Sequence, residues 1–343
     1  MVRAVGIDQW RGRLFRDGEP YNVLGLNAPQ AATYWAVNWG CGSQMGDAEL
    51  DQMFASVPKG TVFGFWATQA MAYDNKSAMA IDFTGIDRVF AAAERRGQLV
   101  APALETQQGF CSDGHFKDEA WYGGDFKRAF DDDGRGLQKL SYWDYLHLVV
   151  PRYRSSPALA WWVPVTEPET STCAPGRKGG DCYAASVCSS TAAATLRDFF
   201  DEVGGEIVRL DPNHLLSSAT IGGGQCGTKG YDYTYVHASP ALGICESHAY
   251  DDPEALSDGM RSAIAACRLA GKTFIAGEVG RSAGTGRKCS SANRRRDQVR
   301  AQADAIQGAE GSGLLLWQYL TKADGCGYGI EPGDPVLSIV GPR

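Results

Sequence analysis

The sequence has no run of about 18 or more apolar residues, the length that a membrane-spanning helix needs. It has no excess of basic charge: the net charge is −7, whereas nucleic acids and anionic membranes attract basic surfaces, so neither is an expected partner. It contains no C-x-x-C pair, and its five histidines are scattered, so we expect neither a metal nor another cofactor. It also lacks a low-complexity linker, which favours a single domain over residues 1–343.

Cysteine, in contrast, is abundant, with ten residues in the chain. This number in an acidic chain is typical of disulfide-bonded proteins, so we expect a secreted or cell-surface protein; a cytosolic protein with buried thiols is the alternative. The first ten residues lack the apolar core of a signal peptide, so a secreted form is expected to have lost its signal.

Most of the cysteines follow expected strands. We expect up to four disulfides to tie these loops together, with the pairing open: the loop cysteines are Cys41, Cys111, Cys173, Cys182, Cys188, Cys226, Cys289 and Cys326. Cys245 and Cys267 lie instead in an expected strand and the helix after it.

Short apolar runs alternate with helical patterns along the whole chain. Eight runs are predicted to be strands buried on both faces: Tyr21–Asn27, Thr61–Thr68, Leu99–Glu105, Leu159–Thr166, Leu215–Ala219, Gly243–Ser247, Thr273–Gly277 and Gly313–Trp317. Apolar spacings of three and four residues predict five helices between them: Ile86–Arg96, Tyr142–Arg154, Ala192–Leu210, Ser257–Ala270 and Ala292–Gly308. This alternation predicts an α/β fold, a (β/α)8 TIM barrel, with residues 1–20 as a hairpin that caps its bottom.

Two of these strands end in a glutamate. Glu167 follows the apolar run that contains Trp161, and Glu278 ends the run that begins at Thr273. Burying a carboxylate is costly unless it is paired or used. Because the chemistry of such barrels lies at the carboxyl ends of the strands, we expect the two carboxylates to face each other across the barrel mouth.

The order of motifs resembles that of the retaining glycoside hydrolases with (β/α)8 barrels, most of all glycoside hydrolase family 5, which includes cellulases and β-mannanases. The likeness runs almost end to end. It is carried by Asp17–Tyr21, Gly25–Asn27, Pro151–Pro157, Thr166–Pro168, His248–Tyr250, Gly277–Gly280, Trp317–Tyr319 and Gly327–Pro335.

The resemblance implies a role for each matching residue. It implies that Glu167 is the acid/base and Glu278 the nucleophile of a double displacement. It places His248 near the acid/base and implies that Tyr250 donates a hydrogen bond to the nucleophile. It implies that Trp317 stacks under the sugar at the cleavage site.

The sequence departs from the family pattern at two positions. Thr166 stands where the family has an Asn that binds the sugar 2-hydroxyl, and Gly64 stands where it has an Arg that pairs with the nucleophile. Loss of that cation should raise the pKa of Glu278 unless another donor replaces it, and Arg281 is the expected replacement. The substrate could accordingly carry an altered 2-position or be a furanoside. We also expect Glu246 to point away from the pore.

Further residues could contact sugar. Trp66 and the loop residues Trp35 and Trp39 offer flat indole faces, with core packing as the alternative for each. Glu105 ends the third expected strand and is predicted to reach the sugar. Asp131–Asp133 is expected to be an exposed acidic loop rather than a calcium site.

Together these features predict a secreted, monomeric retaining glycoside hydrolase that cleaves O-glycosidic bonds in a polysaccharide. The alternatives are a transglycosylase of the same fold and a carbohydrate-binding pseudoenzyme.

Overall fold

The computed structural model describes residues 6–38, 41–42, 44–74, 80–129, 140–173, 186–252, 255–284, 289–322 and 325–343. Trp39, Asp131–Asp133 and Cys182 lie outside these residues. No helix in the described part of the chain is long and apolar enough to cross a membrane.

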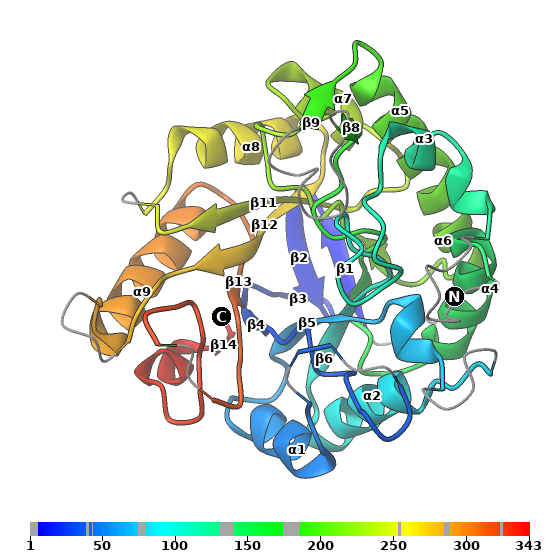
Figure 1. Cartoon of the computed structure of the whole chain (residues 1–343). Coiled ribbons are helices and arrows are strands. Elements are labelled where there is room, and N and C mark those ends of the chain that lie inside the picture. The colour runs from blue at the N-terminus through cyan, green and yellow to red at the C-terminus, as the bar shows by residue number, and fades with distance from the viewer. Residues whose placement is uncertain are drawn as a thin grey trace.

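Parallel strands curl around the centre of the molecule (Figure 1), and their pairings and single bridges close them into a ring. The strands are β4 (Val23–Asn27), β5 (Val62–Trp66), β6 (Leu99–Ala103), β7 (Trp161–Trp162), β10 (Leu215–Leu216), β11 (Ile244–Tyr250), β12 (Thr273–Gly280) and β13 (Gly313–Trp317). Hydrogen-bonded neighbours run from β11 through β12, β13, β4 and β5 to β6, while β7 pairs with β10. Single parallel bridges join β6 to Leu159 and Val163 around β7, and Ser217 after β10 to β11. All eight predicted strands are therefore confirmed, and the fold is a (β/α)8 barrel.

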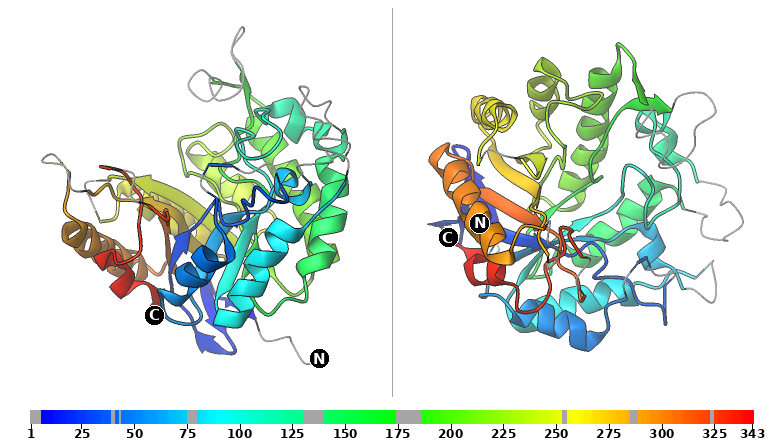
Figure 2. Two further views of the ribbon diagram at one scale, coloured as in Figure 1. Left: turned by 60° about the horizontal axis from the view of Figure 1, so that its bottom comes forward. Right: turned by 60° about the vertical axis from the view of Figure 1, so that its left-hand side comes forward.

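Helices surround this ring (Figure 2). They are α1 (Asp47–Ala55), α2 (Thr84–Arg96), α3 (Glu119–Tyr122), α4 (Tyr142–Tyr153), α5 (Ala192–Phe199), α6 (Gly205–Leu210), α7 (Tyr231–His237), α8 (Asp258–Leu269) and α9 (Ala292–Gly308). A π-helical turn, Phe200–Gly204, joins α5 to α6, so the predicted helix over 192–210 is one continuous element. The five predicted helices are confirmed, whereas α1, α3 and α7 are additional.

A hairpin precedes the barrel, as predicted. It consists of β1 (Ile7–Trp10), β2 (Arg13–Arg16) and β3 (Glu19–Pro20). The backbone N–H of Leu14 donates to Ser312, which precedes β13, so the hairpin lies at the amino-terminal end of the barrel strands (Figure 2, left). At the opposite end, β8 (Ser171–Cys173) and β9 (Ser186–Cys188) form a small antiparallel ribbon. β14 (Gly341–Pro342) pairs with Leu24 and Val23 at the start of β4, on the hairpin's side of the barrel.

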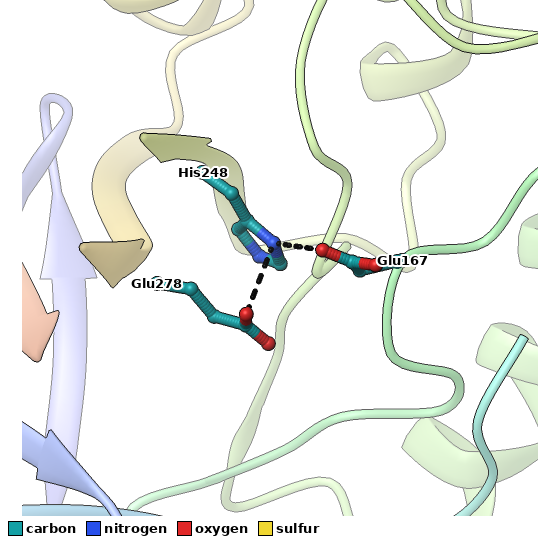
Figure 3. A group of neighbouring side chains, drawn as sticks. All are labelled: Glu167, His248 and Glu278. Carbon is teal, nitrogen blue, oxygen red and sulfur yellow. Dashed lines mark hydrogen bonds and ion pairs between the residues drawn. The ribbon is translucent and has the colours of Figure 1, made fainter. Parts of the chain in front are cut away.

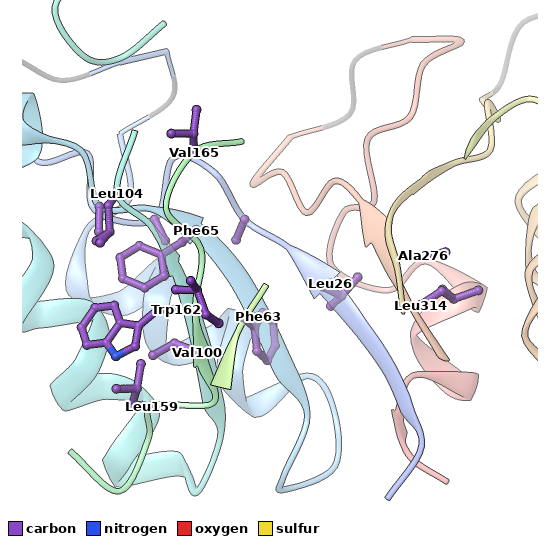
Figure 4. Packing of buried hydrophobic residues seen from close by; sticks show 14 of the residues in the cluster. Leu26, Phe63, Phe65, Val100, Leu104, Leu159, Trp162, Val165, Ala276 and Leu314 are labelled. Carbon is purple, nitrogen blue, oxygen red and sulfur yellow. The ribbon is translucent and has the colours of Figure 1, made fainter. Parts of the chain in front are cut away.

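Alternation along the strands divides the apolar side chains into two buried layers. The inner layer fills the barrel with residues such as Val62, Leu99 and Trp161, and Leu14 of the hairpin packs against it. The outer layer lies between the strands and the helices, where Trp162 and Phe65 are packed (Figure 4). The inner layer leaves the carboxyl end of the barrel to polar side chains, which is where the site lies.

Four disulfides lie among the described residues. Three of them join loops that follow strands, as predicted: Cys41–Cys111, Cys188–Cys226 and Cys289–Cys326. The fourth, Cys245–Cys267, joins β11 to α8, which the sequence did not predict. Cys41–Cys111 ties the loop after β4 to the loop after β6 across 70 residues of sequence.

The loop tie should contribute substantially to stability. Replacing Cys41 and Cys111 together by serine should lower the free energy of unfolding by about 4 kcal/mol, because the unfolded chain regains the freedom of a long closed loop. Denaturant unfolding would measure this, and the single Cys41→Ser variant should lose as much as the double variant.

In addition, the unfolded, unreduced protein should react with almost no thiol reagent. Eight or more free thiols per chain would contradict the disulfide assignment.

Candidate active site

Two glutamates project from the rim of the barrel, one after β7 and one on β12. Glu278 lies within β12 and is buried. Glu167 follows β7 with a left-handed backbone, φ 56°, a conformation that costs a non-glycine residue about 1–2 kcal/mol. Its N–H donates to the carbonyl of Ala219 after β10, at 2.9 Å, which holds the turn in place. This turn directs the Glu167 side chain toward the barrel mouth.

His248 on β11 lies between the two carboxylates (Figure 3). Its Nδ1 is 2.8 Å from Glu167 Oε1 and 3.6 Å from Glu278 Oε2. One carboxylate oxygen of each glutamate and a ring nitrogen of His248 all lie within 4.8 Å of one another. The hydroxyl of Tyr250, two residues further along β11, donates a short hydrogen bond to Glu278 Oε2. The structure therefore brings Glu167, Glu278, His248 and Tyr250 together.

Burial and mutual charge shift the titration of this group. Burial raises the pKa of Glu278 from its ordinary value of 4.5 to about 7; the charge of Glu167 adds to this, while His248 and Tyr250 act against it. Burial by itself would lower the pKa of His248. The carboxylates of Glu278, Glu167 and Glu246 outweigh it and raise the pKa of His248 well above its usual value.

A cavity of about 40 Å³ opens beside these groups, which is room for a few water molecules. Trp66 and Trp317 line it with their rings 6.2 Å apart and tilted by 49°. Thr166 also lines the cavity, and its buried hydroxyl has no hydrogen-bond partner among the described residues. The peptide bond between Trp317 and Gln318 is cis.

Two residues predicted to contact sugar do not line this cavity. Glu105 is buried elsewhere: its carboxylate accepts hydrogen bonds from the Ser112 hydroxyl and the Thr106 N–H, each at 2.8 Å, and lies 3.8 Å from Lys117 Nζ. Burial raises the pKa of Glu105 to about 7. Trp35 is 55% exposed in the loop after β4, so its indole is available to solvent rather than packed in the core.

Arg281 does not take the place of the absent cation. Its guanidinium donates to the side chain of Gln302 at 2.7 Å and to the carbonyl of Asp252. The positive group that acts most strongly on Glu278 is His248. The predicted replacement by Arg281 is therefore wrong.

The prediction for Glu246 is also wrong, since its side chain lines the cavity. Residues two apart on a strand share a face, so Glu246 belongs with His248 and Tyr250. Asn27 at the end of β4 was not predicted. Its amide donates to the carbonyl of Gly277 at 2.9 Å, and a side chain on Gly64 would overlap it.

Glu167, His248 and Glu278 are also close enough together, by distance alone, to hold an ion. However, Nδ1 of His248 is hydrogen-bonded to Glu167, and the raised pKa leaves the ring protonated. A protonated nitrogen has no lone pair to offer a metal. We therefore interpret the three residues as a hydrogen-bonded cluster.

In fold, the chain is a (β/α)8 barrel similar to solved structures of glycoside hydrolase family 5 enzymes, with paired glutamates at the carboxyl ends of its strands. An endo-1,4-β-mannanase from Rhizomucor miehei has the same fold with a TM-score of 0.69, at 17% identity over 97% of this chain and 96% of that one. A family 5 mannosidase from the same organism gives 0.64 at 15% identity, covering 98% and 95%. A Pseudomonas stutzeri endoglucanase gives 0.58 at 14% identity, covering 96% and 95%.

Sequence comparison leads to similar proteins. The chain is 25% identical over 340 residues to probable mannan endo-1,4-β-mannosidases F from Aspergillus flavus and Aspergillus oryzae. The match covers 88% of this chain but 64% of those relatives, so it spans less than two thirds of their length. No family model matches the sequence. The predicted resemblance to family 5 is confirmed by this distant similarity and by the shared fold.

The raised pKa of Glu278 predicts a pH-dependent cost in stability. A carboxyl whose folded pKa lies above its unfolded value stabilises the fold below about pH 4.5, and this contribution is lost as the pH rises through about 7. Glu278→Gln removes the titration, so its Tm relative to wild type should increase between pH 4 and pH 8. Thermal unfolding at both pH values would measure this. Glu49→Gln, at an exposed carboxylate, is the control and should show no such trend; an equal trend in both variants would contradict the assignment.

Proposed function

We propose that the chain is a retaining glycoside hydrolase that acts on a β-linked polysaccharide by double displacement. The observation that carries the proposal is the short distance between the carboxylates of Glu167 and Glu278: one oxygen of each lies within 4.8 Å of the other. Carboxyl groups about 5–5.5 Å apart suit a covalent glycosyl-enzyme intermediate, whereas inversion needs about 6.5–9.5 Å to admit a water molecule.

The environments of the two glutamates support a division of labour. Glu278 is buried, is fixed by the hydrogen bond from Tyr250 and points into the cavity, as a nucleophile requires. Glu167 is partly exposed and its Oε1 accepts a hydrogen bond from His248 Nδ1, so the carboxyl group can pass a proton to a leaving oxygen and then accept one from water. Trp317, in the cavity wall, would stack under the sugar ring.

The names of the sequence relatives favour a mannan-type substrate, that is, a β-1,4-linked polysaccharide cleaved within the chain. The acidic net charge is compatible with such a neutral polymer. The disulfides favour secretion, since they persist in oxidising compartments. A transglycosylase would use the same two glutamates with a sugar as acceptor. A pseudoenzyme would bind the glycan without turnover.

Replacement of either glutamate should separate these possibilities. Glu278→Ala should reduce turnover of an aryl β-mannobioside by at least about 10³-fold, because no covalent intermediate can form. Glu167→Ala should lose most activity on glycosides with poor leaving groups. It should lose little on a dinitrophenyl glycoside, because dinitrophenolate needs no protonation to depart. Added azide should yield the α-glycosyl azide from Glu278→Ala and the β-glycosyl azide from Glu167→Ala, as seen by NMR.

The same experiment identifies the contradicting outcomes. An α-configured first product from the wild-type enzyme would indicate inversion. Binding of mannan without turnover by the wild-type protein would favour the pseudoenzyme.

The unpaired hydroxyl of Thr166 predicts a contact with the substrate. A buried hydroxyl without a partner is costly, and a sugar hydroxyl could supply the missing hydrogen bond. Thr166→Val keeps the side-chain shape, and it should lower kcat/KM about tenfold, or about 1.4 kcal/mol, without loss of Tm. Thr106→Val is the matched control: Thr106 donates to the carbonyl of Phe110 at 2.8 Å, so this variant should lose stability but keep kcat/KM. An unchanged kcat/KM in Thr166→Val would show that the hydroxyl does not bind substrate.

A further inference from the structure

A third carboxylate lies behind the catalytic pair. Glu246 on β11 is 4% exposed and lines the same cavity. Its Oε2 is 3.7 Å from His248 Nε2, on the opposite side of the ring from Glu167. The hydroxyl of Ser217, after β10, donates a short hydrogen bond to its other oxygen, Oε1. Oε1 is thus held by a hydrogen bond, Oε2 faces the imidazole at ion-pair distance, and neither role assigned above involves this carboxylate.

The backbone of the neighbouring strand is shaped to admit this carboxylate. Gly277 precedes the nucleophile on β12, and a Cβ at this position would overlap Glu246 Oε2. Every larger residue at 277 would therefore displace the Glu246 side chain from His248. The space beside Gly277 is the space that the carboxylate occupies.

In the part of the chain that the structure describes, no arginine takes the place of the cation that the family resemblance implies. Gly64 stands at that position, and the Asn27 amide occupies the adjacent space, where a side chain on Gly64 would overlap it. Among the described residues, the carboxylates around His248 are Glu246 on its own strand, Glu278 on β12 and Glu167 after β7. The imidazole is the positive group among three carboxylates.

We propose that Glu246 is a positioning residue that, through His248, keeps the imidazole protonated and fixed as the cation of the site in place of the absent arginine. Ser217 orients the carboxylate, and Gly277 makes room for it. The imidazolium then faces Glu167 and Glu278 with its Nδ1 edge and Glu246 with its Nε2 edge.

The order of charges during double displacement explains why a third carboxylate is needed. When Glu278 attacks, it becomes an ester and loses its charge, while Glu167 gives its proton to the leaving oxygen and becomes negative. When water then attacks the ester, Glu167 takes a proton back and Glu278 recovers its charge. Both partners of Nδ1 therefore change charge during turnover. Glu246 takes no part in these steps, so it is the constant anion that holds the proton on His248.

Glu246→Gln tests the proposal because it keeps the shape and removes the charge. The ring nitrogens of His248 can be followed by ¹⁵N NMR, with the signals assigned by comparison with His248→Asn. In the wild-type protein at pH 7, both nitrogens should carry protons. In Glu246→Gln, the apparent pKa of His248 should fall by at least about one unit, since a neighbouring anion favours the charged ring. This measurement needs no substrate, so it is independent of the proposed function.

The kinetic part of the test rests on the proposed function. In Glu246→Gln, the alkaline limb of kcat/KM on an aryl β-mannobioside should move to lower pH by about one unit, because the proton on His248 is lost earlier. Ser217→Ala keeps the charge but loosens the carboxylate, so it should shift the same limb in the same direction by less. Should Glu246→Gln fail to fold, Ser217→Ala and Glu246→Asp provide the same comparison. The alkaline limb of Glu246→Asp should then lie closer to that of the wild type than the limb of Ser217→Ala does.

Asp211→Asn is the matched control. Asp211 is a buried carboxylate 2.8 Å from His214 Nδ1 at the opposite end of the barrel, before β10. This variant should lose stability yet keep the pH profile and the His248 signals. A His248 that keeps both protons in Glu246→Gln, or an unshifted alkaline limb in an active Glu246→Gln enzyme, would overturn the proposal. Absence of turnover in the wild type together with the expected NMR shift would refute the proposed function alone.

Discussion

The constraint on which this site depends is the placement of several carboxylates in a buried space around the imidazole of His248. Buried charges are costly unless they are paired, and Glu278, Glu246 and the partly exposed Glu167 all lie around His248. The imidazole lowers the cost for each of them. The short hydrogen bonds from Tyr250 and Ser217 complete the arrangement. Positions on β11, β12 and the ends of β7 and β10 must therefore be held accurately relative to one another.

The barrel provides this accuracy. Parallel neighbours β11 and β12 are joined by a continuous ladder with one irregularity between Ser247 and His248. The turn at Glu167 is held by the hydrogen bond from its N–H to the carbonyl of Ala219, which follows the neighbouring strand β10. Loop disulfides such as Cys41–Cys111 brace the face of the barrel on which the site opens. The packing of the hydrophobic layers fixes the positions of the strands relative to one another. The polar groups at the carboxyl ends of these strands are therefore fixed relative to one another as well.

Much of the architecture could be predicted from sequence because buried parallel strands leave short apolar runs. All eight runs became strands, although β7 and β10 are ladders of two residues each. Helix α1 was not predicted, because its apolar residues Leu50, Met53 and Phe54 occupy only one turn of an otherwise polar segment.

The site was predicted less completely, because a strand end fixes a residue's place but not the direction of its side chain. Glu105 ends a strand as Glu167 does, yet it turns to Ser112 and Lys117 beneath a loop. Arg281 is near Glu278 in sequence, but its guanidinium donates a hydrogen bond to Gln302 on α9 instead. Glu246 could have been found from its two-residue spacing to His248, which places both on one face.

The contact between Gly277 and Glu246 has a consequence for how such sequences can diverge. A side chain at 277 cannot coexist with the Glu246 carboxylate in its present place, and a small residue at 246 would leave the space beside Gly277 empty. The two positions, on adjacent strands and 31 residues apart, should therefore covary among homologues. A chain that carries only one of the two substitutions would be defective. Positions 246 and 277 therefore separate barrels of this kind from barrels that have a bulkier residue before the nucleophile, because a single mutation does not lead from one to the other.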